Sequence, residues 1–356
     1  MKVMRITKDV AVIGMSGRFP EAANISEFFE NLKNGRDSLR SVSARRKKNT
    51  TIPTDHDYDL GGYMEDIDLF DHDFFRIAKG EAICMDPRQR LLLEVAYETF
   101  ENAGYNVDFF NGSDTAVFIA DTDLDYFMHA EQYDNMLVTG NMNALAAGRI
   151  ARYFNLRGTA EMIDTGCSSS MIALHHACNE LILGNAKYVL CGGANLFLQP
   201  GYKMEDSIGL DIRSADGKVR AFSAEASGTA GGEAVICVLL KLLNDAVADN
   251  DIIHAVIRSV AVNQDGALSA SLTAPDSIAQ AQVIMKAWEK AGVDPTTITY
   301  IEAHGTGTKL GDPIEIEGID TAFRSVTRAQ QFCAVSSVKT NIGHTNSCAG
   351  MAGLIK

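Results

Sequence analysis

The chain has 356 residues, 46% of them hydrophobic, which is enough for one large domain or two of ordinary size around a substantial core. Its 46 acidic and 32 basic residues give a net charge of −14, which argues against a nucleic-acid-binding protein and favours a cytoplasmic one. The N-terminus lacks an apolar signal segment and no uncharged run reaches about 18 residues, so we predict neither secretion nor a membrane-spanning helix.

The seven cysteines follow a reduced, intracellular pattern. Their number is odd, no C-x-x-C pair occurs, and most of them lie inside apolar runs such as residues 235–239. The sequence therefore predicts neither a disulfide framework nor a zinc site.

The first half of the chain alternates apolar strand patterns with amphipathic helices. The expected strands are residues 10–20 (ending in a glycine turn), 115–120, 158–163, 187–195 and 234–240. The expected helices are residues 26–33 with Ser26 as the N-cap, 85–103 and 143–153, together with one that begins at Cys167. Residues 40–85 are polar and predict a surface region, and the Gly- and Ser-rich residues 214–232 predict a loop near a site.

One basic run, Arg45–Lys48, stands out in this acidic chain. A run of this kind is most often a solvated loop, and otherwise it is a docking site for an acidic partner. The sequence leaves both alternatives open.

A second series of strands and helices begins at His254. It comprises strands 254–263, 298–302 and 332–337, and helices 277–291, 312–323 and one that begins near Asn346. Two such series with long crossovers predict mostly parallel sheets covered by helices, in an internally duplicated α/β fold with halves at 1–248 and 249–356. The final residues, 350–356, lie in an apolar helical pattern without a C-cap, so we expect the chain to be truncated relative to a complete fold.

Residues 161–170 contain a cysteine in a position suited to a nucleophile. An apolar strand pattern turns through Asp164 and Gly166, and a helical pattern opens at Cys167. The unpaired N–H groups and the positive dipole end of a helix N-terminus favour a thiolate, and the small neighbours leave the sulfur open. A lone cysteine is more often a small buried packing residue, so this stretch alone favours the structural alternative.

Two histidines follow apolar strands of the second half, His304 in Ala-His-Gly-Thr-Gly-Thr and His344 in Asn-Ile-Gly-His. The carboxyl ends of parallel strands gather at one edge of a sheet, so Cys167, His304 and His344 are expected to converge. Each histidine alone has many structural roles, but the combination, with Lys339 nearby, favours a functional site. The spacing lacks HxxxH and HExxH, and the adjacent pair His175–His176 cannot face one ion, so no metal site is predicted.

Taken together, five motifs resemble those of the β-ketoacyl synthase (ketosynthase) family of the thiolase-like fold. They are most similar to the ketosynthase domains of modular polyketide synthases. The motifs occur in the family's order and span most of the chain, at residues 12–20, 85–94, 164–170, 302–308 with 311–313, and 339–344.

The resemblance implies a decarboxylative Claisen condensation in polyketide or fatty acid biosynthesis. Cys167 would accept an acyl group from the phosphopantetheine arm of an acyl carrier protein, and His304 and His344 would stabilise the enolate of a malonyl-type extender. Lys339 would order the site, and Thr306 and Thr308 would bind the pantetheine. No bound cofactor is implied.

The resemblance also implies partners. These are the acyl carrier protein, neighbouring synthase domains and a second copy of the chain in a homodimer, whereas no nucleic acid or membrane is expected. Residues 121–143 would border the acyl channel near the homodimer interface, and Arg45–Lys48 would be a candidate contact for the acidic carrier.

The chain departs from the family pattern at several positions. Gly166 stands where the family usually has Ala, which is expected to loosen the turn, and Thr345–Cys348 is more polar than usual. Residues 223–233 lack the acidic and arginine residues common in that loop. Family members continue with two more strands and a turn that completes the oxyanion hole, so the second half is expected to lack its last strands and the polypeptide to be poorly soluble or inactive.

Three functional alternatives therefore remain open from the sequence. The first is a condensing enzyme, an acyltransferase. The second is a non-elongating ketosynthase module that only transfers acyl chains, and the presence of His304 argues against it. The third is an inactive truncated remnant that acts as a dimerisation scaffold. A thiolase or an acyl hydrolase fits the two histidines and Lys339 less well.

Overall fold

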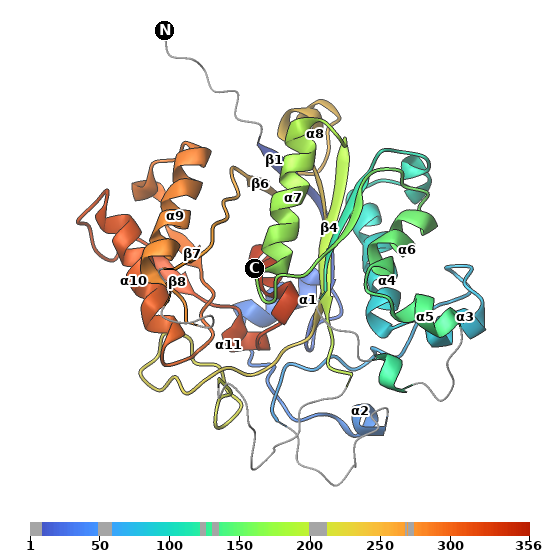
Figure 1. Ribbon diagram of the computed structural model, residues 1–356, viewed down its shortest axis with the longest axis horizontal. Helices are drawn as coiled ribbons and strands as arrows, with labels where there is room; N and C mark the ends of the chain where they lie inside the picture. Colours follow the sequence, from blue (N-terminus) through green and yellow to red (C-terminus); the bar gives the residue numbers. More distant parts are fainter. Residues whose placement is uncertain are drawn as a thin grey trace.

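The computed structural model of the protein describes residues 9–48, 59–121, 126–129, 135–198, 212–267, 269 and 274–356. Its largest sheet has six strands in the order β3-β2-β4-β5-β1-β6, seen nearly edge-on in Figure 1. The strands are β1 Val10–Arg18, β2 Ala116–Ala120, β3 Ala160–Ile163, β4 Tyr188–Asn195, β5 Ala234–Leu242 and β6 Ala255–Ile257.

This sheet is mixed, so the prediction of mostly parallel sheets is wrong for it. β2 pairs in parallel with β3 and β4, whereas β5 is antiparallel to β4 and β1, and β6 is antiparallel to β1. The described residues between β4 and β5 contain no crossover helix that would return the chain to the other end of the sheet, so β5 runs back beside β4. The strand predicted at 254–263 is only three residues long and lies at the edge of this first sheet.

Helices cover both faces of the sheet, because alternate residues of each strand point to opposite sides. Ile13, Ile119 and Leu190 belong to a cluster on the side of α4 (Pro87–Asn102) and α6 (Leu145–Tyr153). Val12, Phe118 and Val189 belong to a second cluster on the side of α7 (Ser169–Leu183) and α12 (Ala349–Ile355). Figure 1 shows these layers with the strands between α7 and the α4–α6 pair.

The other elements of the first half are short. They are α1 Ile25–Lys33, α2 Ala44–Lys48, α3 Lys79–Cys84, η1 Val107–Phe110, η2 Tyr126–His129, α5 Asn135–Asn141 and α8 Leu243–Ala248. The N-cap of α1 is Asn24, whose side chain accepts a hydrogen bond from Glu27 N, so the prediction of Ser26 as N-cap is wrong. Both residue types cap helices well, and the sequence pattern placed the helix start two residues too late.

The second half contains a separate two-stranded parallel sheet of β7 (Tyr300–Glu302) and β8 (Ala334–Ser336). Its remaining elements are α9 Ser277–Ala291, η3 Pro295–Thr297, α10 Gly311–Arg324, α11 Lys339–Ile342, η4 Asn346–Cys348 and α12. α9 packs on α10, with Trp288 and Phe323 in contact at a ring-centroid distance of 4.8 Å. No helix in the described parts of the chain is both long and apolar enough to cross a membrane.

α12 joins the second half to the first by packing on α7 (Figure 1). The backbone N–H of Met351 donates to Ser170 Oγ at 3.1 Å. A Cβ atom on Gly350 would lie 2.2 Å from Cγ of Met171, so a larger residue at this position would require the Met171 side chain to move. The contact places the turn before α7 next to the segment that carries His344.

The basic run Arg45–Lys48 lies in α2, where Arg45 and Lys48 are exposed and Arg46 is buried. Arg46 is buried and makes a two-pronged ion pair with the buried Glu233, with both N···O distances at 2.9 Å. Arg45 pairs with Asp66 and Asp68. A solvated loop and a carrier-docking site are therefore both wrong descriptions of Arg46, because its guanidinium is not available at the surface.

Candidate active site

Cys167 lies on the turn between β3 and α7, two residues before the first helical residue, Ser169. The turn is held by hydroxyl contacts: Ser169 Oγ accepts from Thr165 N at 2.8 Å and donates to Gly166 O at 2.6 Å. Gly166 has φ +66°, a left-handed conformation that favours glycine. The turn leaves the Cys167 side chain exposed, as expected from the small residues around it.

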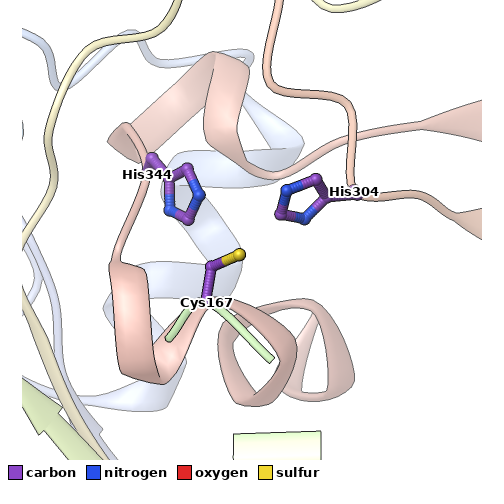
Figure 2. A group of neighbouring side chains, drawn as sticks. All are labelled: Cys167, His304 and His344. Carbon is purple, nitrogen blue, oxygen red and sulfur yellow. The ribbon is translucent and has the colours of Figure 1, made fainter. Parts of the chain in front are cut away.

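The structure brings Cys167, His304 and His344 together. The Cys167 sulfur and one nitrogen of each imidazole all lie within 4.8 Å of one another. The two rings are nearly perpendicular, with centroids 5.3 Å apart, and the sulfur points toward the space between them (Figure 2). This is the convergence that the positions of the three residues after their strands predict.

His344 is fixed on both its backbone and its ring. Its N–H donates to Ala230 O at 2.7 Å and its carbonyl accepts from Gly232 N at 2.9 Å, so the predicted loop at 214–232 does reach the site. Its ring Nδ1 accepts the backbone N–H of Asn346 at 3.0 Å. A neutral ring that accepts at Nδ1 carries its proton on Nε2, so Nε2–H is the donor left for the cluster.

Both imidazoles are held in the neutral form. Burial, and then the charge of Lys339, lowers the pKa of His304 to about 4. The His304 residue is exposed at the site by its surface area, yet enough protein atoms surround its ring to disfavour the charged form. Burial, followed by the charge of Lys339, lowers the pKa of His344 well below its ordinary value. At neutral pH the two rings are therefore uncharged and can serve as hydrogen-bond donors.

Lys339 holds the backbone that carries His304. It is only 3% exposed, and its Nζ donates to the carbonyl of His304 at 2.6 Å. Burial lowers the pKa of Lys339, and the nearby Glu315 and Glu302 carboxylates oppose this effect. The contact supports the ordering role that was inferred for Lys339 by resemblance, which remains a proposal.

Two acidic residues of α10, Glu315 and Asp312, hold the backbone of the loop that carries His304. The sequence alone did not indicate a role for them. The carboxylate of Glu315 accepts the backbone N–H groups of His304 and Gly305 at 2.6 and 2.7 Å. Asp312 accepts those of Gly307 and Phe222 at 3.0 and 2.7 Å. A signal for Asp312 was present in the Gly-Asp-Pro stretch, because a helix that begins beside a glycine-rich loop places a first-turn carboxylate near loop N–H groups. Glu315 lies one turn further along α10 and had no such signal.

Thr306 and Thr308 lie next to the cluster, on the loop between β7 and α10. Their hydroxyl oxygens are 3.1 Å apart, and Thr308 Oγ1 accepts the N–H of Gly311 at 3.1 Å. Thr308 also borders a cavity of about 410 Å³, which is lined by Phe222, Ser223, Ala224, Ala226, Thr308, Lys309, Asp312, Pro313 and Ile316. The loop therefore has polar groups at the edge of an open space.

Cys167, His304 and His344 also have the side-chain types that bind metal ions. The hydrogen bond at His344 argues against metal binding. A metal-binding histidine normally donates its second N–H to a neighbouring acceptor. Here Nδ1 accepts, so coordination through Nε2 would require that nitrogen to lose its proton as well. The geometry suits hydrogen-bond donation to an oxygen better than binding of a cation.

The predicted channel segment, 121–143, lies partly outside the described residues, which omit 122–125 and 130–134. Within the described part, Asn143 Nδ2 donates to Asp121 O at 3.3 Å. Exposed apolar side chains lie on α3, η2 and α5 and directly after α5 (Ile83, Phe127, Met136, Val138 and Met142). The role of the segment in an acyl channel stays a prediction.

Family models match almost the whole chain. The N-terminal domain of β-ketoacyl synthases matches residues 7–246, and the C-terminal domain of the same family matches residues 254–356. Polyketide synthase PksL of Bacillus subtilis is 41% identical over 98% of this chain, which spans 8% of that protein. The highly reducing polyketide synthase sdnO of Sordaria araneosa is 39% identical over 98% of the chain and 12% of its own length.

Solved structures agree with the sequence relatives. Ketosynthase twelve of the bacillaene polyketide synthase of Bacillus amyloliquefaciens superposes with a TM-score of 0.90 at 34% identity, covering 98% of this chain and 64% of that one. The ketosynthase of module 6 of the bacillaene synthase of Bacillus subtilis superposes with a TM-score of 0.87 at 38% identity, covering 98% of this chain and 60% of that one. The predicted thiolase-like α/β fold is thereby confirmed. The chain spans less than two thirds of these structures and a small part of the curated relatives.

Proposed function

The chain belongs to the β-ketoacyl synthase family, and from this premise we propose that it acts as a condensing acyltransferase of a modular polyketide synthase. The Cys167 sulfur attacks a carrier-bound acyl thioester, the carrier thiol leaves with the proton, and the acyl group remains on Cys167. A malonyl-type thioester then loses CO₂, and its enolate carbon attacks the Cys167 thioester. The new C–C bond forms as the C–S bond breaks, which gives a 3-oxoacyl product and frees the Cys167 thiolate to take up a proton.

The observation that carries this proposal is the pair of neutral imidazoles beside Cys167. Decarboxylation builds negative charge on the thioester oxygen, and a neutral N–H group is a donor that needs no counter-ion. Nε2–H of His344 is fixed by the hydrogen bond to Nδ1, and His304 lies opposite it across the sulfur. Removal of one preorganised donor of this kind typically costs about 3 kcal/mol of transition-state stabilisation.

The other residues fit supporting roles in the same reaction. Lys339 and Glu315 hold the main chain of His304 from both sides, through its carbonyl and its N–H. Thr306 and Thr308 would hydrogen-bond the phosphopantetheine arm that brings the substrate, so the domain itself would need no bound cofactor. An acyl carrier protein is then the partner that supplies both thioesters, and such a domain would work in the cytoplasm.

A homodimer is also part of the proposal. Among the strands of the described residues, β3 pairs with β2 alone and is the outer strand of the sheet, with Ala160 and Glu161 exposed. An unpaired strand edge is a ready site for pairing with another chain. The exposed apolar group on α3, η2 and α5 adds a surface that a second copy would cover. We infer that the two copies meet across this side of the molecule.

The experiment that tests the function separates its two steps. The wild-type chain is incubated with an acyl-carrier thioester, and acylation of Cys167 is read by intact-protein mass. Malonyl carrier is then added, and the 3-oxoacyl carrier is sought by mass. The Cys167→Ala variant should not load, and His304→Ala should load but not condense.

The outcomes distinguish the alternatives that the sequence left open. Loading without a condensed product in the wild type would indicate the non-elongating transfer module. Absence of loading would favour the inactive scaffold. Loading followed by condensation would exclude both.

A further inference from the structure

Asn346 occupies an unusual place beside the candidate site. It is the first residue of η4 and has φ +37°, a left-handed conformation that asparagine tolerates better than most residues. In this conformation its backbone N–H points at Nδ1 of His344, 3.0 Å away. The orientation of one peptide group therefore decides which nitrogen of His344 carries the proton.

The side chain of Asn346 is anchored to the end of β4. Its Nδ2 donates to Oδ1 of Asn195 at 3.3 Å, and Nδ2 of the buried Asn195 donates to the carbonyl of Gly232 at 2.7 Å. A carbonyl can only accept, so the Gly232 contact fixes which way the Asn195 amide faces. Asn195 then presents an oxygen, and Asn346 must present its NH₂ group.

Neighbouring contacts hold the same segment from both sides. Ser347 Oγ donates to Ala194 O at 2.7 Å, and Gly232 N donates to His344 O at 2.9 Å. The anchor thus runs from the last residues of β4 through Asn195 to the Asn346 peptide and ends at the His344 ring. None of these contacts involves Cys167.

We propose that Asn346 is a positioning residue that sets the tautomer of His344, and that the Asn195–Asn346 contact locks it. The locked peptide N–H keeps Nδ1 as an acceptor and Nε2 as a donor toward the reacting oxygen. Without the lock the segment relaxes to φ below zero, the peptide N–H turns away, and the Nδ1–H tautomer becomes populated. That tautomer presents a lone pair to an oxygen that is gaining negative charge.

The inference deepens the proposed function, and it rests on that function for its prediction about activity. Decarboxylation needs the Nε2–H donor of His344 for the enolate oxygen that gains negative charge. Attack by Cys167 on the first thioester forms no such enolate, so it depends less on the His344 tautomer. The two steps should therefore respond differently to changes at Asn346. A residue that only stabilised the fold would affect both steps alike.

The test uses Asn346→Ala, which removes the amide and disfavours the left-handed conformation, and Asn346→Gly, which removes the amide but keeps that conformation. Malonyl-pantetheine decarboxylation and acylation of Cys167 by an acyl N-acetylcysteamine thioester are measured separately. We expect Asn346→Ala to lower decarboxylation about 10-fold or more and acylation less than about 3-fold, with Asn346→Gly in between. Asn341→Ala, which removes another side-chain amide contact of the same region (Nδ2 to Arg36 O, 2.9 Å), is the matched control and should change neither.

A direct reading of the tautomer is independent of activity. Selective ¹⁵N labelling of histidine gives distinct shifts for protonated and unprotonated ring nitrogens. In the wild type His344 should show an unprotonated Nδ1, and in Asn346→Ala a mixture of tautomers. Asn346→Asp places a carboxylate against Oδ1 of Asn195 and should also release the lock, so it serves if the alanine variant fails to fold.

The results separate failure of the inference from failure of the proposed function. If the wild type shows no decarboxylation, the proposed function fails, and the ¹⁵N spectra still decide the role of Asn346. A wild-type tautomer in both Asn346→Ala and Asn346→Asp overturns the inference. Parallel losses of acylation and decarboxylation with an unchanged tautomer also overturn it.

Discussion

The buried pair of Arg46 and Glu233 provides the sharpest test of how the loops around the site are held. Their side chains are 2% and 0% exposed. Glu233 accepts two N–H groups of Arg46, both at 2.9 Å, and the backbone N–H groups of Met64 and Phe197 at 2.7 and 2.8 Å. Every contact of the carboxylate is charge-assisted, and Glu233 directly follows Gly232, which binds the His344 carbonyl.

We expect Arg46→Met to destabilise the fold by about 3–5 kcal/mol, because it leaves a buried carboxylate without its cation. Glu233→Gln keeps the size of the side chain but turns an NH₂ group toward N–H donors, and it should cost at least about 2 kcal/mol. The double variant Arg46→Met with Glu233→Gln should cost less than the sum of the two single changes, because neither partner is then left as a lone buried charge.

The assay is urea unfolding followed by circular dichroism, with the free energy of unfolding extrapolated to water. Lys33→Ala is the control: it removes an ion pair with Glu30 at 2.9 Å in which the side chains are 56% and 60% exposed. That exposed pair should contribute no more than about 0.5 kcal/mol. The reasoning is refuted if Arg46→Met costs no more than Lys33→Ala, or if the double variant is fully additive.

Single features of the structure give four further tests. Gly166→Ala meets no atom within 4 Å but forces a side chain into φ +66°, so it should lower the free energy of unfolding by about 1 kcal/mol, measured by urea. Thr308→Val removes the proposed pantetheine contact and should raise KM for the carrier-bound substrate several-fold with a smaller change in kcat. Met136→Asp with Val138→Asp puts charges on side chains that are 50% and 46% exposed, and should shift the proposed dimer to monomer in sedimentation velocity. Burial lowers the pKa of His344, so below about pH 6.5 the unfolded chain binds a proton at this residue and the folded chain does not. The contribution of His344 to stability therefore decreases as the pH is lowered. The difference in unfolding free energy between wild type and His344→Gln should shrink from about pH 7.5 to about pH 5.

Two of these predictions have matched controls in the chain. Gly148 lies inside α6 with no positive φ and open space around an added Cβ, so Gly148→Ala should stabilise the protein, opposite in sign to Gly166→Ala. Leu183 at the end of α7 is 72% exposed and lies outside the proposed dimer surface. Leu183→Asp should therefore leave the sedimentation coefficient unchanged, and a monomer in that variant would contradict the assignment of the interface to α5.

The sequence could predict that the three side chains of the candidate site converge, because strand ends and glycine turns are local signals. Cys167, His304 and His344 each follow an apolar strand, and α/β folds bring such positions to one edge. The direction of β5 could not be predicted in the same way. It depends on which strand of the sheet the chain returns to after residues 196–233, and no periodicity within β5 itself encodes that choice.

The burial of Arg46 in the basic run could not be predicted from the sequence for a different reason. Arg45 and Arg46 are neighbours of the same type, yet one is at the surface and the other is buried against a carboxylate 187 positions away along the chain. Charge alone indicates solvent exposure, and only the position of Glu233 in three dimensions reverses that expectation. The N-cap of α1 was missed by a smaller margin, because Asn24 and Ser26 are both good caps.

Most contacts that position the two imidazoles are made by main-chain atoms. His304 is held through its N–H by Glu315 and through its carbonyl by Lys339. His344 is held through its N–H, its carbonyl and the peptide of Asn346. A side chain that hydrogen-bonds to the backbone of a histidine fixes the position of its imidazole ring without contacting the substrate-facing side of the ring. The loops can therefore differ in polarity, as at 345–348, while both rings keep their place opposite Cys167.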